Sequence, residues 1–161
     1  MTTDQVPEVS VREPLAALRY GLIPVHGYDI VVATVTAMLD GVHGNGARAR
    51  VLQPGEPIPY GALPVLVAPS TVFGALAVER MVRAWSPGVP RPWLVLVADV
   101  PASAVPAARY RLRALSDRLA GTAHVPYLPV LRAVEAPEDA LKNADVARAA
   151  AKLCRQMEGT K

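Results

Sequence analysis

Residues 93–98, WLVLVA, form the stretch that decides the fold of this 161-residue chain. Every side chain in it is apolar, and Asp99 follows directly. A short apolar run that stops at a turn residue is typical of a strand covered on both faces, as in a parallel sheet. Residues 64–68, PVLVA, repeat the pattern between turn residues. We therefore expect these two segments to lie side by side in one sheet.

Segments with helical periodicity follow these strands. Ser70 or Thr71 can cap a helix whose apolar side chains recur at helical spacing up to Trp85. A second amphipathic helix is expected over residues 106–120, with Gly121 as its stop. Pro137 opens the last predicted helix. The expected inward face of that helix consists of Leu141, Ala144, Ala147, Ala151, Cys154 and Met157.

The first third of the chain contains a strand and an ambiguous segment. Residues 20–25 form an apolar run that ends at His26 and Gly27, which predicts a strand feeding a turn. The β-branched content of residues 30–39 favours a strand, whereas their length, Asp29 as a cap and the Gly41 stop favour a helix. We prefer the helix and leave the strand as the alternative. Short strands are expected at 49–52 and 124–129.

Strands that alternate with helices specify the fold class. We predict a three-layer α/β domain with a mainly parallel sheet and helices on both faces. The domain is expected to span residues 15–161, after a flexible arm at residues 1–14. The loops after Val25, Ala68, Ala98 and Leu128 then lie along one edge of the sheet, where ligands of such folds bind. The polar residues delivered there include Ser70, Thr71 and Asp99.

Composition excludes several classes of protein. With 52% hydrophobic and 19% charged residues, the chain matches neither a disordered segment nor a coiled coil. A single cysteine excludes an internal disulfide and fits a reducing cytoplasm, and the polar start does not resemble a signal peptide. Prolines interrupt the uncharged stretch between Glu56 and Glu79, so it does not predict a membrane span. We expect a cytoplasmic protein without membrane contact.

The basic residues suggest one candidate contact surface. The formal net charge is +3, and Arg109, Arg111, Arg113 and Arg118 cluster in one predicted helix. Such a cluster can contact the phosphates of nucleic acid, or it can be a solvated helix face. Both interpretations remain open. Nucleic acid is therefore a candidate partner, with Arg109, Arg111 and Arg113 as the contacts.

Catalytic and metal-binding motifs are weak. His26, His43 and His124 have no ligand spacing between them, so we predict no metal site. Ser70 and Asp99 lack the G-x-S-x-G elbow of a serine hydrolase. Cys154 lies on the predicted apolar face, where an inert thiol is expected. Residues 43–48, HGNGAR, are glycine-rich but lack a strong preceding strand and a following lysine, so we expect a plain turn.

The second half of the chain resembles a known family. The matching segments are residues 64–71 with Gly74, residues 83–85, residues 94–99 with Pro101, and residues 124–129 with Arg132. In this order they resemble the later part of a MinD/ParA-type ATPase domain, and more closely an actinobacterial group of P-loop-like proteins. The resemblance covers the chain from Pro64 to Glu158. It implies that Ser70, Thr71, Asp99 and Arg132 lie at the ligand edge of the sheet.

The phosphate loop of that family is degenerate here. Its place is taken by His26, Gly27, Tyr28 and Asp29, with one glycine and no lysine. Phosphate binding needs successive backbone N–H groups at a helix N-terminus and a neutralising cation, and Asp29 adds a like charge. We therefore expect no ATPase activity, no catalytic residue and no cofactor.

The resulting hypothesis is a pseudo-ATPase. We expect a non-enzymatic MinD/ParA-like domain that acts in protein interaction or self-association, with a partner protein or a homodimer. The resemblance implies a context in actinobacterial mobile elements or phage. One alternative is a nucleotide-binding ATPase-like protein to which a partner chain supplies the missing charge. The other is a DNA-associated accessory protein.

Overall fold

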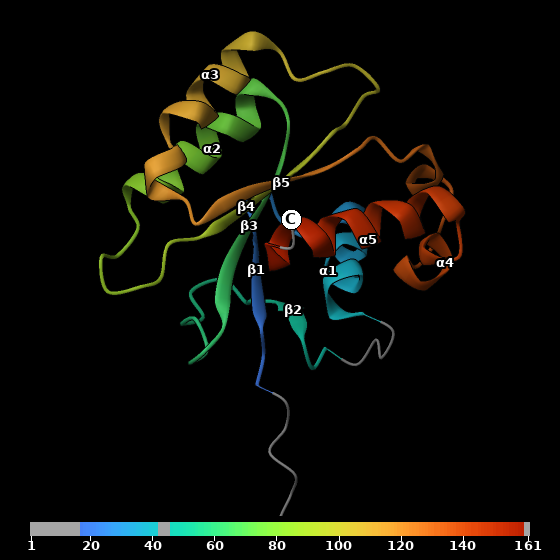
Figure 1. The fold of residues 1–161 in the computed structure, drawn as a ribbon, viewed down its shortest axis with the longest axis horizontal. Helices are drawn as coiled ribbons and strands as arrows, with labels where there is room; N and C mark the ends of the chain where they lie inside the picture. The colour runs from blue at the N-terminus through green and yellow to red at the C-terminus, as the bar shows by residue number, and fades with distance from the viewer. Residues whose placement is uncertain (1–16, 42–45, 160–161) are drawn as a thin grey trace, which may run out of the picture.

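The computed structural model describes residues 17–41 and 46–159 and contains a five-stranded sheet (Figure 1). The strands are β1 (Tyr20–Pro24), β2 (Ala49–Val51), β3 (Leu63–Pro69), β4 (Trp93–Val97) and β5 (Gly121–Val125). Their order is β2-β1-β3-β4-β5, and all the pairs are parallel. This is one of the common orders of doubly wound sheets. The segments predicted to lie side by side do so, with Leu66 opposite Leu94.

Helices cover both faces of the sheet, as predicted for a three-layer α/β domain (Figure 1). One face carries α1 (Ile30–Asp40), α4 (Pro137–Leu141) and α5 (Ala144–Glu158). The other carries α2 (Val72–Arg83) and α3 (Pro106–Ala114). Alternate residues of β4 contribute to different cores. Val95 and Val97 pack against the α1, α4 and α5 side of the sheet, whereas Leu94 and Leu96 pack against the α2 and α3 side.

The ambiguous segment is a helix. Asp29 caps α1, and Gly41 ends it in a left-handed conformation with φ of 80°. Its threonines do not disrupt the helix because the hydroxyls of Thr34 and Thr36 donate to the carbonyls of Ile30 and Val32, both at 2.7 Å. Burial of the apolar face against the sheet outweighs the weak helix propensity of β-branched side chains.

Asp40 connects the end of α1 to the edge strand β2. Its buried carboxylate accepts hydrogen bonds from the backbone N–H groups of Gly46, Arg48 and Ala49, at 2.8, 2.9 and 3.1 Å. Burial by itself would raise the pKa of Asp40, but these hydrogen bonds together outweigh it and hold the pKa below its usual value. The carboxylate therefore stabilises the entry into β2.

Two predicted boundaries near α3 are wrong. The helix ends at Ala114 instead of continuing to residue 120, and a 3-10 turn, Ser116–Arg118, follows it. Gly121 is not a helix stop, because it is the first residue of β5, which ends at Val125 and not at residue 129. A Cβ atom at Gly121 would lie 2.4 Å from the Trp93 ring, so the close approach of the neighbouring strand explains this glycine.

The predicted C-terminal helix is two helices. Asn143 separates α4 from α5, and its side chain accepts from the N–H groups of Asp145 and Val146. Within α5 the larger side chains of Val146 and Leu153 face the core, so Ala144, Ala147 and Ala151 are exposed and not inward as predicted. The buried residues of α5 are Val146, Ala149, Leu153 and Met157.

Some expectations concern residues outside the described ranges. The predicted arm at residues 1–14 lies there, as does His43 with part of the predicted 43–48 turn. Within residues 17–41 and 46–159, no helix combines the length and the apolar character needed to cross a membrane.

Candidate functional site

The carboxyl edge of the sheet contains a topological switch point between β1 and β3. The chain leaves β1 to form α1 on one face of the sheet, whereas it leaves β3 to form α2 on the opposite face. The loops that follow these adjacent strands therefore diverge and leave a crevice, which is where doubly wound sheets bind ligands. The predicted phosphate-loop residues and the 70–71 pair both lie here.

A cavity of about 290 Å³ occupies this crevice. Its walls come from the ends of β1, β3 and β4 and from the first turn of α1. His26, Gly27 and Asp29 line it from one side, and Asp99 lines it from the end of β4. Within the part of the chain that the structure describes, no lysine or arginine lines it, so the two carboxylates make it an acidic crevice.

Asp29 lies at the N-terminus of α1 and caps it. Its carboxylate accepts a hydrogen bond from the N–H of Val32 at 2.9 Å, and its carbonyl accepts from the N–H of Ala33, also at 2.9 Å. Helix N-terminal N–H groups are the donors that bind phosphate in glycine-rich loops. In this chain a side chain of the protein itself takes one of these donors and brings a negative charge to the same place.

Ser70 and Thr71, in the turn after β3, have different roles. Thr71 caps α2, because its hydroxyl accepts from the N–H of Gly74 at 2.9 Å. Ser70 does not cap the helix; its N–H donates to the carbonyl of Val97 at 3.0 Å, and its side chain lines a different cavity. The turn is tight, since a Cβ atom at Gly74 would lie 2.2 Å from the Pro69 carbonyl oxygen.

Asp99 and Arg132 share a second crevice at this edge. Both line a cavity of about 400 Å³ together with Tyr127 and Val100. Asp99 lines the switch-point crevice as well, so it lies between the two cavities. Of the sheet-edge candidates, the structure therefore brings Asp99 and Arg132 together, while Thr71 has a structural role in α2.

Aromatic side chains project beside the acidic crevice. The rings of His26 and Phe73 stack with centroids 4.6 Å apart and an interplanar angle of 8°. Phe73 is 69% exposed, and Tyr28 on the loop after β1 is 70% exposed. Val72, next to Phe73, is also exposed. We call His26, Tyr28, Val72 and Phe73 the aromatic surface. Sequence inspection missed it because only tertiary structure brings the loops after β1 and β3 together.

The structure separates the three arginines proposed as nucleic-acid contacts. Arg111 pairs with Glu79 of α2 at 3.1 Å, and Glu79 also pairs with Arg83 at 2.7 Å. Arg109 and Arg113 instead line a cavity of about 610 Å³ between α3 and β5. His124 and Lys152 line the same cavity, although no sequence motif linked them to the arginines. Strand alternation in β5 was the one available signal for His124.

The remaining nucleophile and metal candidates have structural explanations. The Cys154 thiol packs against the core and donates to the carbonyl of Met38 at 3.4 Å. Burial, followed by the nearby charge of Glu158, raises the pKa of this thiol, which makes it a poor nucleophile. Among residues 17–41 and 46–159, no group of three histidine, cysteine or carboxylate side chains is arranged to hold a metal ion.

Comparison with protein-family models, curated proteins and solved structures found no match for this chain. The function is therefore inferred from the geometry of its surfaces.

Proposed function

We propose that this chain is a non-enzymatic α/β domain of MinD/ParA type with a degenerate phosphate loop, and that it acts by binding a partner protein at the carboxyl edge of its sheet. The single observation that carries the proposal is the hydrogen bond from Val32 to the Asp29 carboxylate. The N-terminus of α1 is thereby capped by the chain's own acid, at the position where the related ATPases hold phosphate.

The electrostatics of the crevice oppose a triphosphate. Asp29 and Asp99 both line it, and no basic side chain of the described residues lines it to offset their charge. A phosphate would have to displace Asp29 from the Val32 N–H and approach a second carboxylate. The two apolar cores on either side of the sheet consist of side chains of the protein itself. Loss of nucleotide binding is therefore compatible with the fold.

The aromatic surface supports a role in protein binding. Exposed aromatic side chains often dominate the energetics of protein interfaces. Phe73 and Tyr28 project from adjacent loops, and the stack on His26 restricts the Phe73 ring before any partner arrives. Asp99 is exposed close to the same edge. The complementary partner is a protein with an apolar patch bordered by basic side chains.

A thermal-shift assay with nucleotides tests the proposed absence of nucleotide binding and hydrolysis. A ligand that binds only the folded state raises the melting temperature, and the rise grows with the logarithm of the ligand concentration once this exceeds Kd. We expect no rise with ATP or GTP, each with Mg²⁺. A rise that grows with nucleotide concentration would overturn the non-enzymatic assignment and favour the ATPase-like alternative.

Variants of the aromatic surface test the proposed binding of a partner protein. We expect Tyr28→Ser with Phe73→Ser to abolish capture of a specific partner that the wild-type chain retains. Tyr60→Ser is the control, because Tyr60 is fully exposed but lies outside the aromatic surface. Light scattering measures self-association. If the wild type is a dimer and the double variant is a monomer, the partner is a second copy of this chain. Equal capture by wild type and double variant would contradict the proposed surface.

A further inference from the structure

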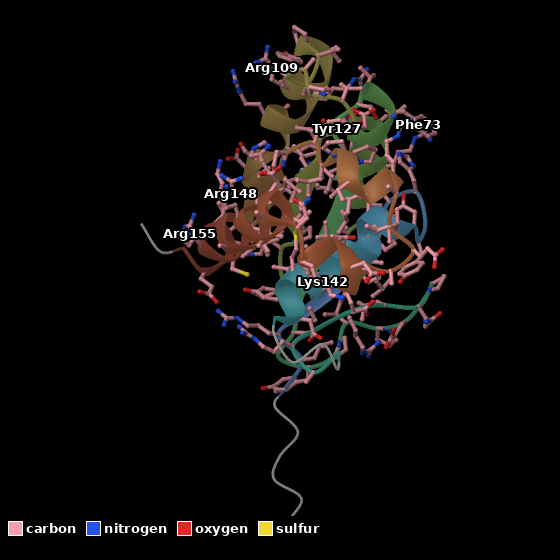
Figure 2. The ribbon with its side chains drawn as sticks, turned by 90° about the vertical axis from the view of Figure 1, so that its right-hand side faces the viewer. Phe73, Arg109, Tyr127, Lys142, Arg148 and Arg155 are labelled. Atoms are coloured by element: carbon pink, nitrogen blue, oxygen red, sulfur yellow. The ribbon has the colours of Figure 1, made fainter. Side chains whose placement is uncertain are left out.

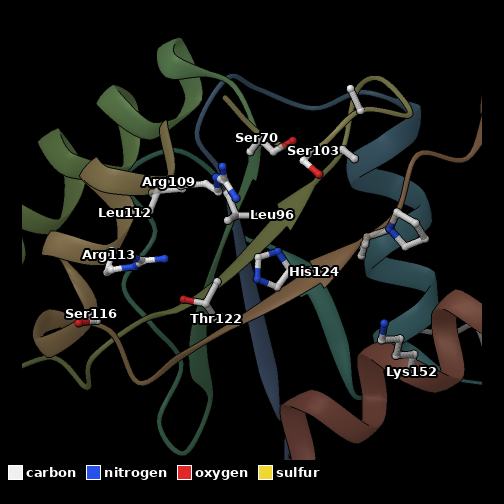
Figure 3. A pocket seen from close by; sticks show the side chains of 15 residues that line it. Ser70, Leu96, Ser103, Arg109, Leu112, Arg113, Ser116, Thr122, His124 and Lys152 are labelled. Carbon is white, nitrogen blue, oxygen red and sulfur yellow. The ribbon is translucent and has the colours of Figure 1, made fainter. Parts of the chain in front are cut away.

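The cavity between α3 and β5 is separate from the aromatic surface. Its residues come from β4, β5, α3, α5 and the loops after β3 and β4. Figure 3 shows Arg113 reaching from α3 toward Thr122 and His124 on β5, with Lys152 approaching from α5. In Figure 2, Phe73 lies on the opposite side of the molecule from Arg148 and Arg155. We call this cavity and its lining side chains the basic cleft.

The basic cleft exists because α2 and α3 leave part of the sheet uncovered. Ala123 and Val125 of β5 point into the core beneath α1 and α5. The alternate residues, Thr122 and His124, must face the side of α2 and α3, and both are exposed. Leu112 of α3 packs with the β4 side chains, so the last strand has no helix above it. The exposed face of β5 therefore forms the floor of the cleft.

A hydrogen bond between α5 and β5 holds Lys152 beside the floor of the cleft. The side-chain oxygen of Gln156 on α5 accepts a hydrogen bond from the backbone N–H of His124 at 2.9 Å. This bond ties α5 to the edge strand. Lys152 lies one helical turn before Gln156 on the same helix, so its ammonium group reaches the cleft from the far side of β5.

The charge of the cleft is positive and unbalanced. Arg109, Arg113, His124 and Lys152 line it, and among residues 17–41 and 46–159 no aspartate or glutamate does. Arg109, Arg113 and Lys152 form no ion pair with any residue in the described ranges. Arg111, on the same helix, is instead paired with Glu79. The unpaired cations therefore converge on one cavity, whereas a solvated helix face would leave them dispersed.

The arrangement suits a chain of phosphates better than a single anion. Arg109 and Arg113 are one turn apart, about 6 Å along the α3 axis, which is close to the separation of successive phosphates in an extended nucleic-acid strand. Beyond the cleft, Arg148 and Arg155 occupy exposed positions of α5 about one turn before and after Lys152, and Arg148 pairs with Asp145. Figure 2 shows Arg109, Arg148 and Arg155 along one side of the molecule. Basic side chains therefore extend across the β5 edge.

We propose that the basic cleft binds the sugar–phosphate backbone of a single-stranded nucleic acid. Arg109, Arg113 and Lys152 contact successive phosphates, the hydroxyls of Ser70, Ser103 and Thr122 donate to phosphate or sugar oxygens, and the exposed His124 ring stacks on a base. A single strand fits because its backbone can follow a concave groove between a helix and a strand. This binding is independent of the partner-protein site at the carboxyl edge.

Fluorescence anisotropy tests the proposal with a labelled oligothymidylate of about 15 nucleotides, near the upper site size of single-strand-binding folds. We expect saturable binding that weakens with salt. Arg109→Ala with Arg113→Ala should weaken it roughly tenfold or more. The slope of log K against log salt should fall by about 0.7 for each phosphate contact removed. An oligouridylate arm identifies the sugar, because tighter binding of RNA would assign the site to RNA.

Arg111→Ala is the control, to be compared with Arg109→Ala and Arg113→Ala made singly, since it removes one positive charge from the same helix but leaves the cleft unchanged. It should alter affinity by less than about twofold. Lys152→Gln changes a residue of α5 instead of α3, and it should also weaken binding of the oligonucleotide. This variant tests the proposal if the double arginine variant fails to fold. Unchanged affinity in the cleft variants, an equal loss in Arg111→Ala, tighter binding of duplex than of single strand, or no binding at low salt would each overturn the proposal.

Discussion

The carboxylate of Asp29 accepts a hydrogen bond from the backbone N–H of Val32, so α1 begins on an acid of its own chain. The same bond stabilises the helix and removes a donor from the crevice at the β1/β3 switch point. One residue therefore links the stability of α1 to the predicted absence of phosphate binding, and the two consequences can be measured separately.

Replacement of the α1 cap should lower stability. We expect Asp29→Ala to reduce the free energy of unfolding by about 1 kcal/mol, because the Val32 N–H loses its acceptor. Urea denaturation monitored by circular dichroism measures the change. Asp29→Ser should retain most of the stability, since a serine hydroxyl can accept the same bond. Equal losses of stability in both variants would show that the Asp29 cap does not account for the change in the free energy of unfolding.

Asp40 should make stability depend on pH. We expect Asp40→Asn to cost about 2 kcal/mol at neutral pH, because an amide cannot accept all three backbone hydrogen bonds as well as a carboxylate. The folded-state pKa of Asp40 is lowered, so this stabilisation is present above the unfolded-state pKa of about 3.9 and is lost as pH falls through the folded-state pKa. Urea titrations at decreasing pH should therefore show the wild type converging on the variant.

The control for Asp40 is an exposed carboxylate. Asp139 pairs with Lys142 at 3.6 Å, and its side chain is 55% exposed. Asp139→Asn should change the free energy of unfolding by less than about 1 kcal/mol at neutral pH. A pH-independent difference between wild type and Asp40→Asn would contradict the role assigned to the Asp40 carboxylate.

The contact between Gly121 and Trp93 should make Gly121 intolerant of a methyl group. We expect Gly121→Ala to destabilise the fold by about 1–3 kcal/mol, because the added Cβ would lie 2.4 Å from the indole ring and force it to move. Gly88→Ala is the matched control, as nothing lies within 4 Å of its added Cβ. Thermal and urea denaturation of the two variants should differ clearly, and equal melting temperatures would refute the close approach.

The phase of α5 can be tested with one substitution at two positions. Ala149 is buried in the core, whereas Ala151 is exposed. We expect Ala149→Glu to cost roughly 3 kcal/mol or more, because it places a carboxylate in an apolar core without a partner. Ala151→Glu should change stability by about 0.5 kcal/mol or less. The reverse ranking would restore the phase predicted from sequence.

Local pattern was sufficient for most elements of the fold. The apolar runs at 64–68 and 93–98 predicted adjacent parallel strands, and Asp29 with Gly41 correctly favoured a helix at 30–39. These predictions succeeded because burial, capping and turn residues act within a few positions of one another. The C-terminal helix was predicted less well, because Asn143 caps a second helix there and Val146 and Leu153, not the predicted alanines, pack into the core.

The sequence by itself determined a layered α/β domain and placed an acid at the N-terminus of its first helix. Tertiary structure decided which side chains act together. It paired Arg111 with Glu79, directed Arg109 and Arg113 toward His124, and stacked His26 on Phe73. These groups come from elements far apart in the chain, and their meeting depends on strand order and on the part of β5 that the helices leave uncovered. Neither property can be read from local periodicity.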